Sequence, residues 1–221
     1  MPEASDRDDV RARVAEAARR LAAERLVIGT AGNVSARSGE HVAITPTGAN
    51  LEDLTAAQVA LVDLDGAQVG GDLQPSSELG LHLGVYRRFS AGAVVHTHAP
   101  MATALSCAID ELPVVHYQML MLGGAVRVAP YATFGTPELA EVTLDALDGR
   151  SAALMANHGA ITYGHDLDTA VDHSLLLEWA CGVYWHAKAI GGPRTMDAAQ
   201  SQAVVDAAVQ RSYGTTQERT S

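Results

Sequence analysis

The feature that most limits the fold is the interleaving of helix-like and strand-like segments along the chain. Apolar residues recur at helical spacing over residues 7–25 and again over 167–190, and short apolar runs with strand character lie between them. These runs include AVVHTHA, SAALMA and AITYG, and turns rich in Gly or Pro separate them. No internal repeat or low-complexity linker interrupts the pattern. We therefore expect a single α/β domain over residues 1–221, with helices covering a mixed sheet and a flexible polar tail from about residue 213.

Charge and hydropathy limit the classes of partner. The chain has 221 residues and a formal net charge of -11, and no Lys/Arg cluster provides the positive surface that nucleic-acid binding requires. The first residues are charged rather than apolar, and no apolar run approaches the ~20 residues of a membrane span. Cys107 and Cys181 lie in apolar segments, so we expect both to be buried and unpaired. These features predict a cytoplasmic protein that binds neither nucleic acid nor membranes.

Two histidines on one expected strand form the first candidate site. In VVHTHA, the alternation of a strand directs His96 and His98 to one face and Thr97 to the other. The segment is otherwise apolar, and burying polar groups without partners is costly. We therefore interpret the pair as metal ligands rather than as exposed polar residues. A third ligand, His158, is available in NHG, a tight turn where Gly159 permits close approach of the backbone.

An acidic residue completes the candidate metal site. Glu78 follows PSS in the first turn of an expected helix, where the helix dipole stabilises a carboxylate and Ser76 or Ser77 is the expected cap. Taken alone, Glu78 would be an ordinary acid at a helix start, but with three imidazoles it forms a ligand set suited to zinc. His82, one helical turn further on, is an alternative ligand or a residue that supports the ligands. A metal bound here would act as a Lewis acid toward an oxygen or a carbonyl.

Three short turns ahead of the histidine strand are rich in Gly, Ser, Thr and Asn. GTAGNVS, PTG and PSS offer backbone N–H groups and hydroxyls, which are the groups that hold phosphate. Each of them, taken alone, is more often a plain turn. Together they predict an anionic substrate even in an acidic protein, because local donors matter more than net charge. Tyr117 either packs in the core or donates a proton beside the metal, and its position in the sequence does not decide between the two.

The blocks GTAGNVS, ITPTG, PSSE, VVHTHA, HYQMLMLGG, APYATFGT and NHG, in this order, resemble the signature motifs of the class II aldolase and adducin superfamily. The similarity runs from about Gly29 to the end of the long helix, with a fainter match at 212–214, and is greatest to the L-fuculose-1-phosphate aldolases. It implies a three-layer αβα domain with a central, largely antiparallel mixed sheet. It also implies a homotetramer with active sites at subunit interfaces. The resemblance implies that zinc, or another divalent metal, is bound by Glu78, His96, His98 and His158.

The resemblance further implies a role for each site residue. The substrate phosphate would be held by Gly32, Asn33, Thr47, Gly48, Ser76 and Ser77. Glu78 would leave the metal and remove a proton beside the dihydroxyacetone phosphate carbonyl, and zinc would stabilise the enediolate. Tyr117 of a neighbouring subunit would protonate the aldehyde oxygen, and Phe134 and Tyr213 would shape the aldehyde end. The expected reaction is the reversible cleavage of a ketose 1-phosphate, such as L-fuculose 1-phosphate, to dihydroxyacetone phosphate and an aldehyde.

Other functions on the same scaffold stay open. An L-ribulose-5-phosphate 4-epimerase typically carries Asp where this chain has Glu78, which favours the aldolase. A methylthioribulose-phosphate dehydratase would keep similar zinc ligands, and a noncatalytic adducin-like module would lose them. The chain has Asn157 where family aldolases often have a second histidine, and its tail matches only around Tyr213. L-Fuculose, rhamnulose and 5-deoxypentulose phosphates therefore all fit as substrates.

Overall fold

The computed structural model describes residues 4–211 and arranges their strands in one nine-stranded sheet. The strands are β1 (Asn33–Ser38), β2 (His41–Ile44), β3 (Ala60–Asp63), β4 (Gln68–Gly70), β5 (Ala93–Thr97), β6 (Glu111–Leu112), β7 (Val126–Ala129), β8 (Ala152–Met155) and β9 (Gly159–Gly164). Their order across the sheet is β4-β3-β2-β1-β5-β9-β8-β7-β6. Paired neighbours are antiparallel except β7 and β8, which are parallel. β5 therefore lies in the middle of the sheet, between β1 and β9.

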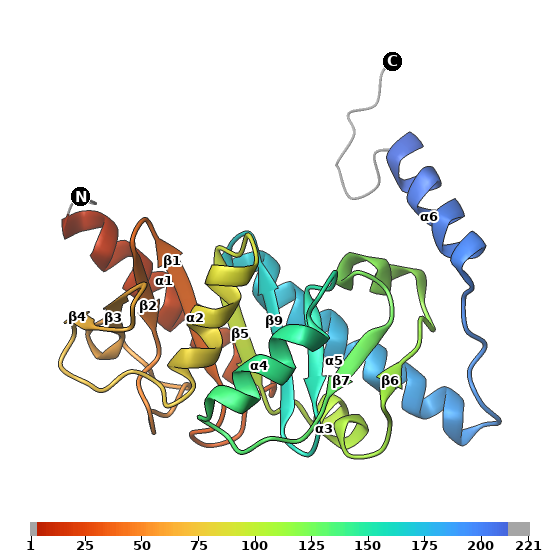
Figure 1. Cartoon of the computed structure of the whole chain (residues 1–221), viewed down its shortest axis with the longest axis horizontal. Coiled ribbons are helices and arrows are strands. Elements are labelled where there is room, and N and C mark those ends of the chain that lie inside the picture. The colour runs from red at the N-terminus through yellow and green to blue at the C-terminus, as the bar shows by residue number, and fades with distance from the viewer. Residues whose placement is uncertain (1–3, 212–221) are drawn as a thin grey trace.

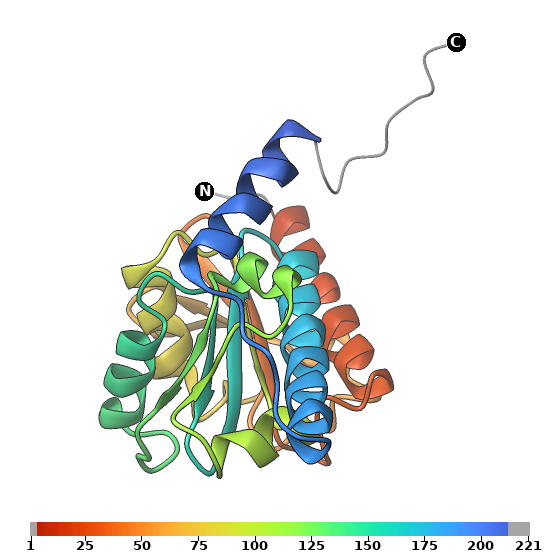
Figure 2. The same cartoon turned by 90° about the vertical axis from the view of Figure 1, so that its right-hand side faces the viewer.

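Helices cover both faces of the sheet. They are α1 (Ala4–Ala23), α2 (Leu79–Arg88), α3 (Pro100–Ser106), α4 (Pro137–Ala146), α5 (Leu167–Ala189) and α6 (Ala198–Gln210), with short 3-10 helices η1 (Ala56–Gln58) and η2 (Tyr117–Leu122). Figure 2 shows α1 and α5 on one face of the sheet and α2 and α4 on the other. The expected three-layer αβα fold with a largely antiparallel mixed sheet is confirmed.

The sheet separates two hydrophobic cores, and β5 contributes to both. Val95 packs in the core that α1, α3 and α5 cover, whereas the adjacent Val94 packs in the core under α2 and α4. This alternation follows from the two-residue period of a strand. His96 therefore faces the same side as Val94, toward the layer that contains α2. The fold thus brings the first histidine to the helix that follows Glu78.

The last described helix lies apart from the three layers. Figure 1 shows α6 beyond β6, and none of its residues is buried.

None of the described helices is long and apolar enough to cross a membrane. Tyr213 and the tail expected from about residue 213 lie outside the described residues, and the single-domain assignment for residues 1–221 stays a prediction.

The two cysteines differ from each other in exposure. Both are free, and Cys181 is buried as expected, but Cys107 is exposed. The expectation for Cys107 was wrong because this residue is the C-cap of α3, beyond the buried face that Ala102 and Leu105 form. Apolar neighbours in the sequence do not bury a residue at the end of a short helix.

Candidate metal and substrate site

Three histidines meet at the end of β5. His96 lies on β5, His98 directly follows it, and His158 lies in the turn between β8 and β9. A ring nitrogen from each of them lies within 4.8 Å of the others. The Nε2 atoms of His96 and His98 are 3.0 Å apart. The structure therefore gathers the three predicted ligands into one group that could hold a metal ion.

The turn that carries His158 passes very close to β5. Asn157 has φ 55°, in the left-handed region that Asn tolerates better than most residues. A Cβ atom at Gly159 would overlap the carbonyl oxygen of Thr97 and would lie 3.2 Å from Cδ2 of His98. Glycine is therefore required here, as the sequence indicated, and the close approach places His158 beside His98.

A backbone carbonyl determines which ring nitrogen of His96 carries a proton. Its Nδ1 atom lies 2.9 Å from the carbonyl oxygen of Ala160. Because a carbonyl only accepts hydrogen bonds, Nδ1 carries the proton, and in the neutral ring Nε2 presents its lone pair toward His98 and Glu78. Metal-ligating histidines are commonly held in this way by a carbonyl behind the ring.

Glu78 directs its carboxylate at the histidines. Its Oε2 lies 3.2 Å from Nε2 of His96, and its Oε1 lies 3.6 Å from Nε2 of His158. Among the described residues, the buried Oε1 atom has no hydrogen-bond partner. A buried oxygen without a hydrogen-bond partner loses the free energy of its hydration. A ring nitrogen that presents a lone pair to another acceptor carries a similar cost. A cation among these atoms would satisfy both, so the residues fit a metal ion with three imidazoles and one carboxylate.

The start of α2 differs from the prediction. Glu78 is itself the N-cap, and neither Ser76 nor Ser77 caps the helix through its side chain. Instead, Ser76 Oγ accepts a hydrogen bond from the backbone N–H of Glu78 at 3.2 Å, and Ser76 O accepts from the N–H of Leu79 at 3.0 Å. This tight turn delays the helix to Leu79, and it fixes the backbone of Glu78 at the entrance of the site.

The charge states in the site suit metal binding. Burial, together with the nearby His96 and His158, lowers the pKa of His98 to about 4 against an opposing effect of Glu78. Burial also lowers the pKa of His158. Burial alone would raise the pKa of Glu78, but His96, the Asn33 hydrogen bond, His158 and His82 together lower it. Near neutral pH the imidazoles of His98 and His158 are therefore neutral and the carboxylate of Glu78 is ionised, which are the forms that bind metals.

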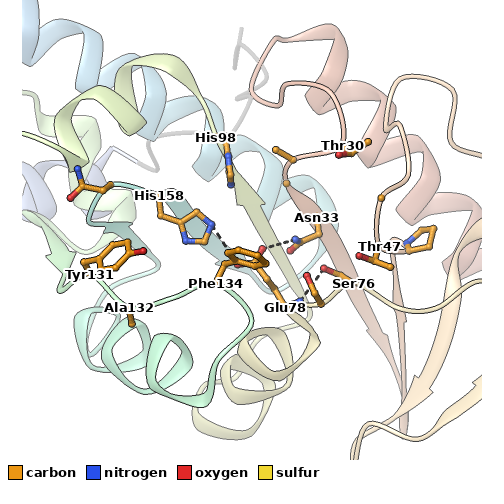
Figure 3. Close-up of a pocket in the computed structure, with 16 residues that line it drawn as sticks. Thr30, Asn33, Thr47, Ser76, Glu78, His98, Tyr131, Ala132, Phe134 and His158 are labelled. Carbon is orange, nitrogen blue, oxygen red and sulfur yellow. Dashed lines mark hydrogen bonds and ion pairs between the residues drawn. The ribbon is translucent and has the colours of Figure 1, made fainter.

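The histidine group opens into a pocket of about 350 Å³. Figure 3 shows His98 and His158 on one side of this pocket and Asn33, Thr47 and Ser76 on the other. Its lining includes every residue predicted to hold phosphate: Gly32, Asn33, Thr47, Gly48, Ser76 and Ser77. The described lining contains no Lys or Arg. The polar groups on the side of the pocket formed by the phosphate loops are therefore neutral, apart from the carboxylate of Glu78.

Backbone hydrogen bonds join two of the predicted phosphate loops. The N–H of Thr47 donates to the carbonyl of Gln74 at 3.1 Å, and the N–H of Ser76 donates to the carbonyl of Thr45 at 3.1 Å. PTG and PSS therefore form one paired edge of the pocket, although they lie far apart in the sequence.

Aromatic residues line the outer part of the pocket. Phe134 lies there, as predicted, and is 68% exposed, and Tyr131 lies beside it at 64% exposed. Tyr131 was missed, although it belongs to the block APYATFGT that carried the resemblance. The signal available was a second aromatic residue in the same loop as Phe134.

Tyr117 lies away from this pocket within its own chain. It begins η2, its ring centroid is 4.5 Å from that of His116, and it lines a separate apolar groove with Val205 and Val209 of α6. Within one chain, Tyr117 therefore does not line the pocket that contains His98 and His158. Tyr213, the other residue predicted near the substrate, lies outside the described residues.

Residues 12–185 match the profile described as the class II aldolase and adducin N-terminal domain. The chain belongs to this family. It is 38% identical over 193 residues to the 5-methylthioribulose-1-phosphate/5-deoxyribulose-1-phosphate aldolase of Rhodospirillum rubrum, covering 86% of this chain and 87% of that protein. It is 41% identical over 167 residues to the L-fuculose phosphate aldolase of Escherichia coli, covering 75% and 77% of the two chains. The predicted membership is confirmed, and the chain is a class II aldolase, an enzyme of the aldehyde-lyase class.

A solved structure supports the same assignment. An L-fuculose 1-phosphate aldolase superimposes on this class II aldolase with a TM-score of 0.87 at 32% sequence identity, covering 94% of this chain and 97% of that one. Class II aldolases depend on a metal ion, and the group of three histidines could bind one.

Proposed function

We propose that this class II aldolase reversibly cleaves a ketose 1-phosphate to dihydroxyacetone phosphate and an aldehyde, with zinc held by Glu78, His96, His98 and His158. The observation that supports this most is the shared pocket: the candidate phosphate loops and the candidate metal ligands line one cavity. In a ketose 1-phosphate the carbonyl is one carbon away from the carbon that bears the phosphate. A site for it must therefore place phosphate donors and a group that polarises the carbonyl within one small space.

Each group of residues in the pocket has a separate role in the proposed reaction. When bound, the divalent cation supplies Lewis-acid stabilisation of the negative charge that develops on the ketone oxygen. Glu78 is the proposed base: Asn33 donates to its Oε2 at 2.9 Å, while its Oε1 has no hydrogen-bond partner among the described residues. In the direction of condensation, Glu78 removes a proton from the carbon beside the carbonyl of dihydroxyacetone phosphate. The six loop residues hold the phosphate through neutral N–H and hydroxyl groups.

Residues of a second subunit complete the proposed site. Tyr117 is 38% exposed and lies outside the pocket of its own chain, which supports its supply by a neighbouring subunit as proton donor to the aldehyde oxygen. We therefore propose a homotetramer with active sites at subunit interfaces. Phe134 and Tyr213 would shape the aldehyde end. The cytoplasmic location stays a prediction from the sequence.

The first candidate substrate is L-fuculose 1-phosphate, because the aldolase of Escherichia coli and the superimposed structure are named for it. A second candidate is a 5-deoxypentulose 1-phosphate, such as 5-deoxyribulose 1-phosphate or its 5-methylthio derivative. The similarity to the Rhodospirillum rubrum aldolase supports the second, because it covers more of this chain, 86%. The exposed rings of Tyr131 and Phe134 at the outer end of the pocket are compatible with the apolar end of the aldehyde that either substrate would release.

Release of dihydroxyacetone phosphate tests the proposal directly. Purified enzyme is incubated with each ketose 1-phosphate, and the product is measured before chelation, after chelation and after zinc is added back. We expect one or more of these substrates to be cleaved, with activity lost on chelation and restored by zinc. L-Ribulose 5-phosphate is tested in parallel, and its conversion to xylulose 5-phosphate without any cleavage would instead identify an epimerase.

A substitution of the proposed base separates binding from chemistry. Glu78→Gln keeps the shape of the side chain but cannot accept the proton, so we expect deuterium exchange into dihydroxyacetone phosphate to be abolished. Glu138→Gln is the matched control, because Glu138 is an exposed acid in the first turn of α4. Normal exchange in Glu78→Gln would contradict the assigned role.

A further inference from the structure

A buried line of polar side chains runs from Glu78 into the interface between α2 and β1. Asn33 Nδ2 lies 2.9 Å from Glu78 Oε2, and Asn33 Oδ1 contacts His82 Nε2. His82 Nδ1 lies 2.7 Å from Ser35 Oγ, which in turn lies 2.7 Å from the hydroxyl of Tyr86. All five side chains are buried, and His82 and Ser35 are fully so. No role in the proposed reaction has yet been given to His82, Ser35 or Tyr86.

The spacing of two secondary structures creates this line. Asn33 and Ser35 are two residues apart on β1 and share a face, whereas Val34 and Ala36 turn to the core on the opposite side. On α2, His82 and Tyr86 follow the N-cap residue at intervals of four, so they also share a face. Two residues of a strand span about 6.6 Å and four residues of a helix span about 6 Å. The side chains on this face of β1 therefore have nearly the same spacing as those on the facing side of α2, and the two sets can alternate along the interface.

The carboxylate determines the direction of every hydrogen bond in the line. An ionised carboxylate only accepts, so the nitrogen of the Asn33 amide must face Glu78 and its oxygen must face His82. His82 Nε2 must then carry the proton, which leaves Nδ1 to accept from the hydroxyl of Ser35. The Ser35 oxygen in turn accepts from the Tyr86 hydroxyl. Each group donates toward Glu78, so the orientation of each group fixes that of the next.

We propose that His82 is a positioning residue for Glu78, holding the Asn33 amide in the orientation in which it donates to Oε2. This proposal rests on the proposed function, in which Glu78 is the base. With His82 in place, Oε2 of Glu78 is anchored, and Oε1 is the oxygen that would take the reacting proton once Glu78 has left the metal. Without the His82 N–H, the Asn33 amide keeps only its bond to the carboxylate, so its plane is held less firmly and its donation to Oε2 is weaker. A side-chain amide carries two N–H groups, so Asn33 can serve Glu78 and the substrate phosphate together.

Three substitutions test the role of His82 by proton exchange. In D2O without aldehyde, deuterium incorporation into dihydroxyacetone phosphate reports proton removal by Glu78. His82→Leu should lower the exchange rate by about 10–100-fold, with a zinc content near that of the wild type. His82→Gln restores an N–H donor near the position of Nε2 and should recover most of the rate. Ser35→Ala removes only the next link and should cause a smaller loss.

Control measurements separate this role from general effects of losing a buried histidine. His173→Leu is the matched control, because His173 is buried on α5 and bonds through Nδ1 to the carbonyl of Tyr163. Its exchange rate should equal that of the wild type. Exchange in His82→Leu within twofold of the wild type, or a loss that follows zinc content, would overturn the proposal. If His82→Leu fails to fold, the same criteria apply to Ser35→Ala.

The protonation of His82 provides a readout that does not depend on activity. Nitrogen-15 NMR of the metal-free enzyme, labelled at histidine, should show the His82 ring with its proton on Nε2. A proton on Nδ1 would reverse the line and overturn the proposal. If the wild type neither exchanges nor cleaves, the proposed function fails, whereas an active wild type with an unaffected His82→Leu variant leaves that function standing and refutes only the role of His82.

Discussion

Replacing Gly159 with alanine tests how closely the metal site depends on the approach of two strands. The new Cβ would overlap the carbonyl oxygen of Thr97 and lie 3.2 Å from Cδ2 of His98. Because the nearest atom is backbone, no side-chain rotation can relieve the overlap. The β8–β9 turn and the end of β5 must move apart by about 1 Å to restore ordinary contact.

This displacement has two expected magnitudes. Overpacking of a well-filled site typically costs about 1–3 kcal/mol, so the free energy of unfolding should fall by this amount. The same shift separates His98 from His158, and metal–ligand distances tolerate only about 0.2 Å. We therefore expect metal affinity to fall by at least about 10-fold.

Denaturant unfolding of the metal-free protein measures the first effect, and zinc titration against a competing chelator measures the second. Gly80→Ala is the control, because a Cβ built on Gly80 in α2 meets nothing within 4 Å beyond its chain neighbours and the backbone of its own helix. This control should be as stable as the wild type or more stable by up to about 1 kcal/mol. Wild-type stability and zinc affinity in Gly159→Ala would show that the strands are not held together as described.

Three further predictions concern the metal, the start of α3 and the proton donor. Removing zinc should lower the thermal stability, and zinc at 100 times its dissociation constant should restore about 2.7 kcal/mol, as calorimetry would show; a stability independent of zinc would contradict the site. Glu178→Ala should destabilise the protein by about 0.5–2 kcal/mol in denaturant unfolding, because Glu178 accepts the backbone N–H groups of Met101 at 2.9 Å and Ala102 at 2.8 Å. Tyr117→Phe should slow aldehyde turnover without changing the zinc content measured by atomic absorption, and loss of zinc would contradict its role.

Local signals in the sequence predicted the helices over residues 7–25 and 167–190 and the strands in AVVHTHA, SAALMA and AITYG, and the same kind of signal explains where other helices begin. Thr136 caps α4 by accepting the N–H of Leu139 at 3.2 Å, and Pro100 begins α3, because capping and proline effects act within one helical turn. The order of the strands could not be predicted in this way. β5 pairs with β1 and β9, which are distant in the sequence, and only the packing of the whole sheet selects these partners.

The candidate site was predictable to a similar extent. Strand alternation correctly directed His96 and His98 to a common space, whereas His158 and Glu78 joined them through ligand chemistry and resemblance. The link from His82 through Asn33 to Glu78 was beyond reach, because it depends on how α2 packs against β1. The role of each residue in metal binding and catalysis stays a prediction.

The absence of Lys and Arg from the described lining of the pocket also affects how substrate is captured. Cationic side chains attract an anion from as far as a Debye length, about 8 Å at physiological ionic strength, whereas neutral N–H groups act only at contact. Apart from the cation itself, nothing in this lining draws the phosphate in from a distance, and the formal net charge of -11 opposes its approach. In the metal-free protein, added salt should therefore speed the encounter with phosphate slightly instead of slowing it.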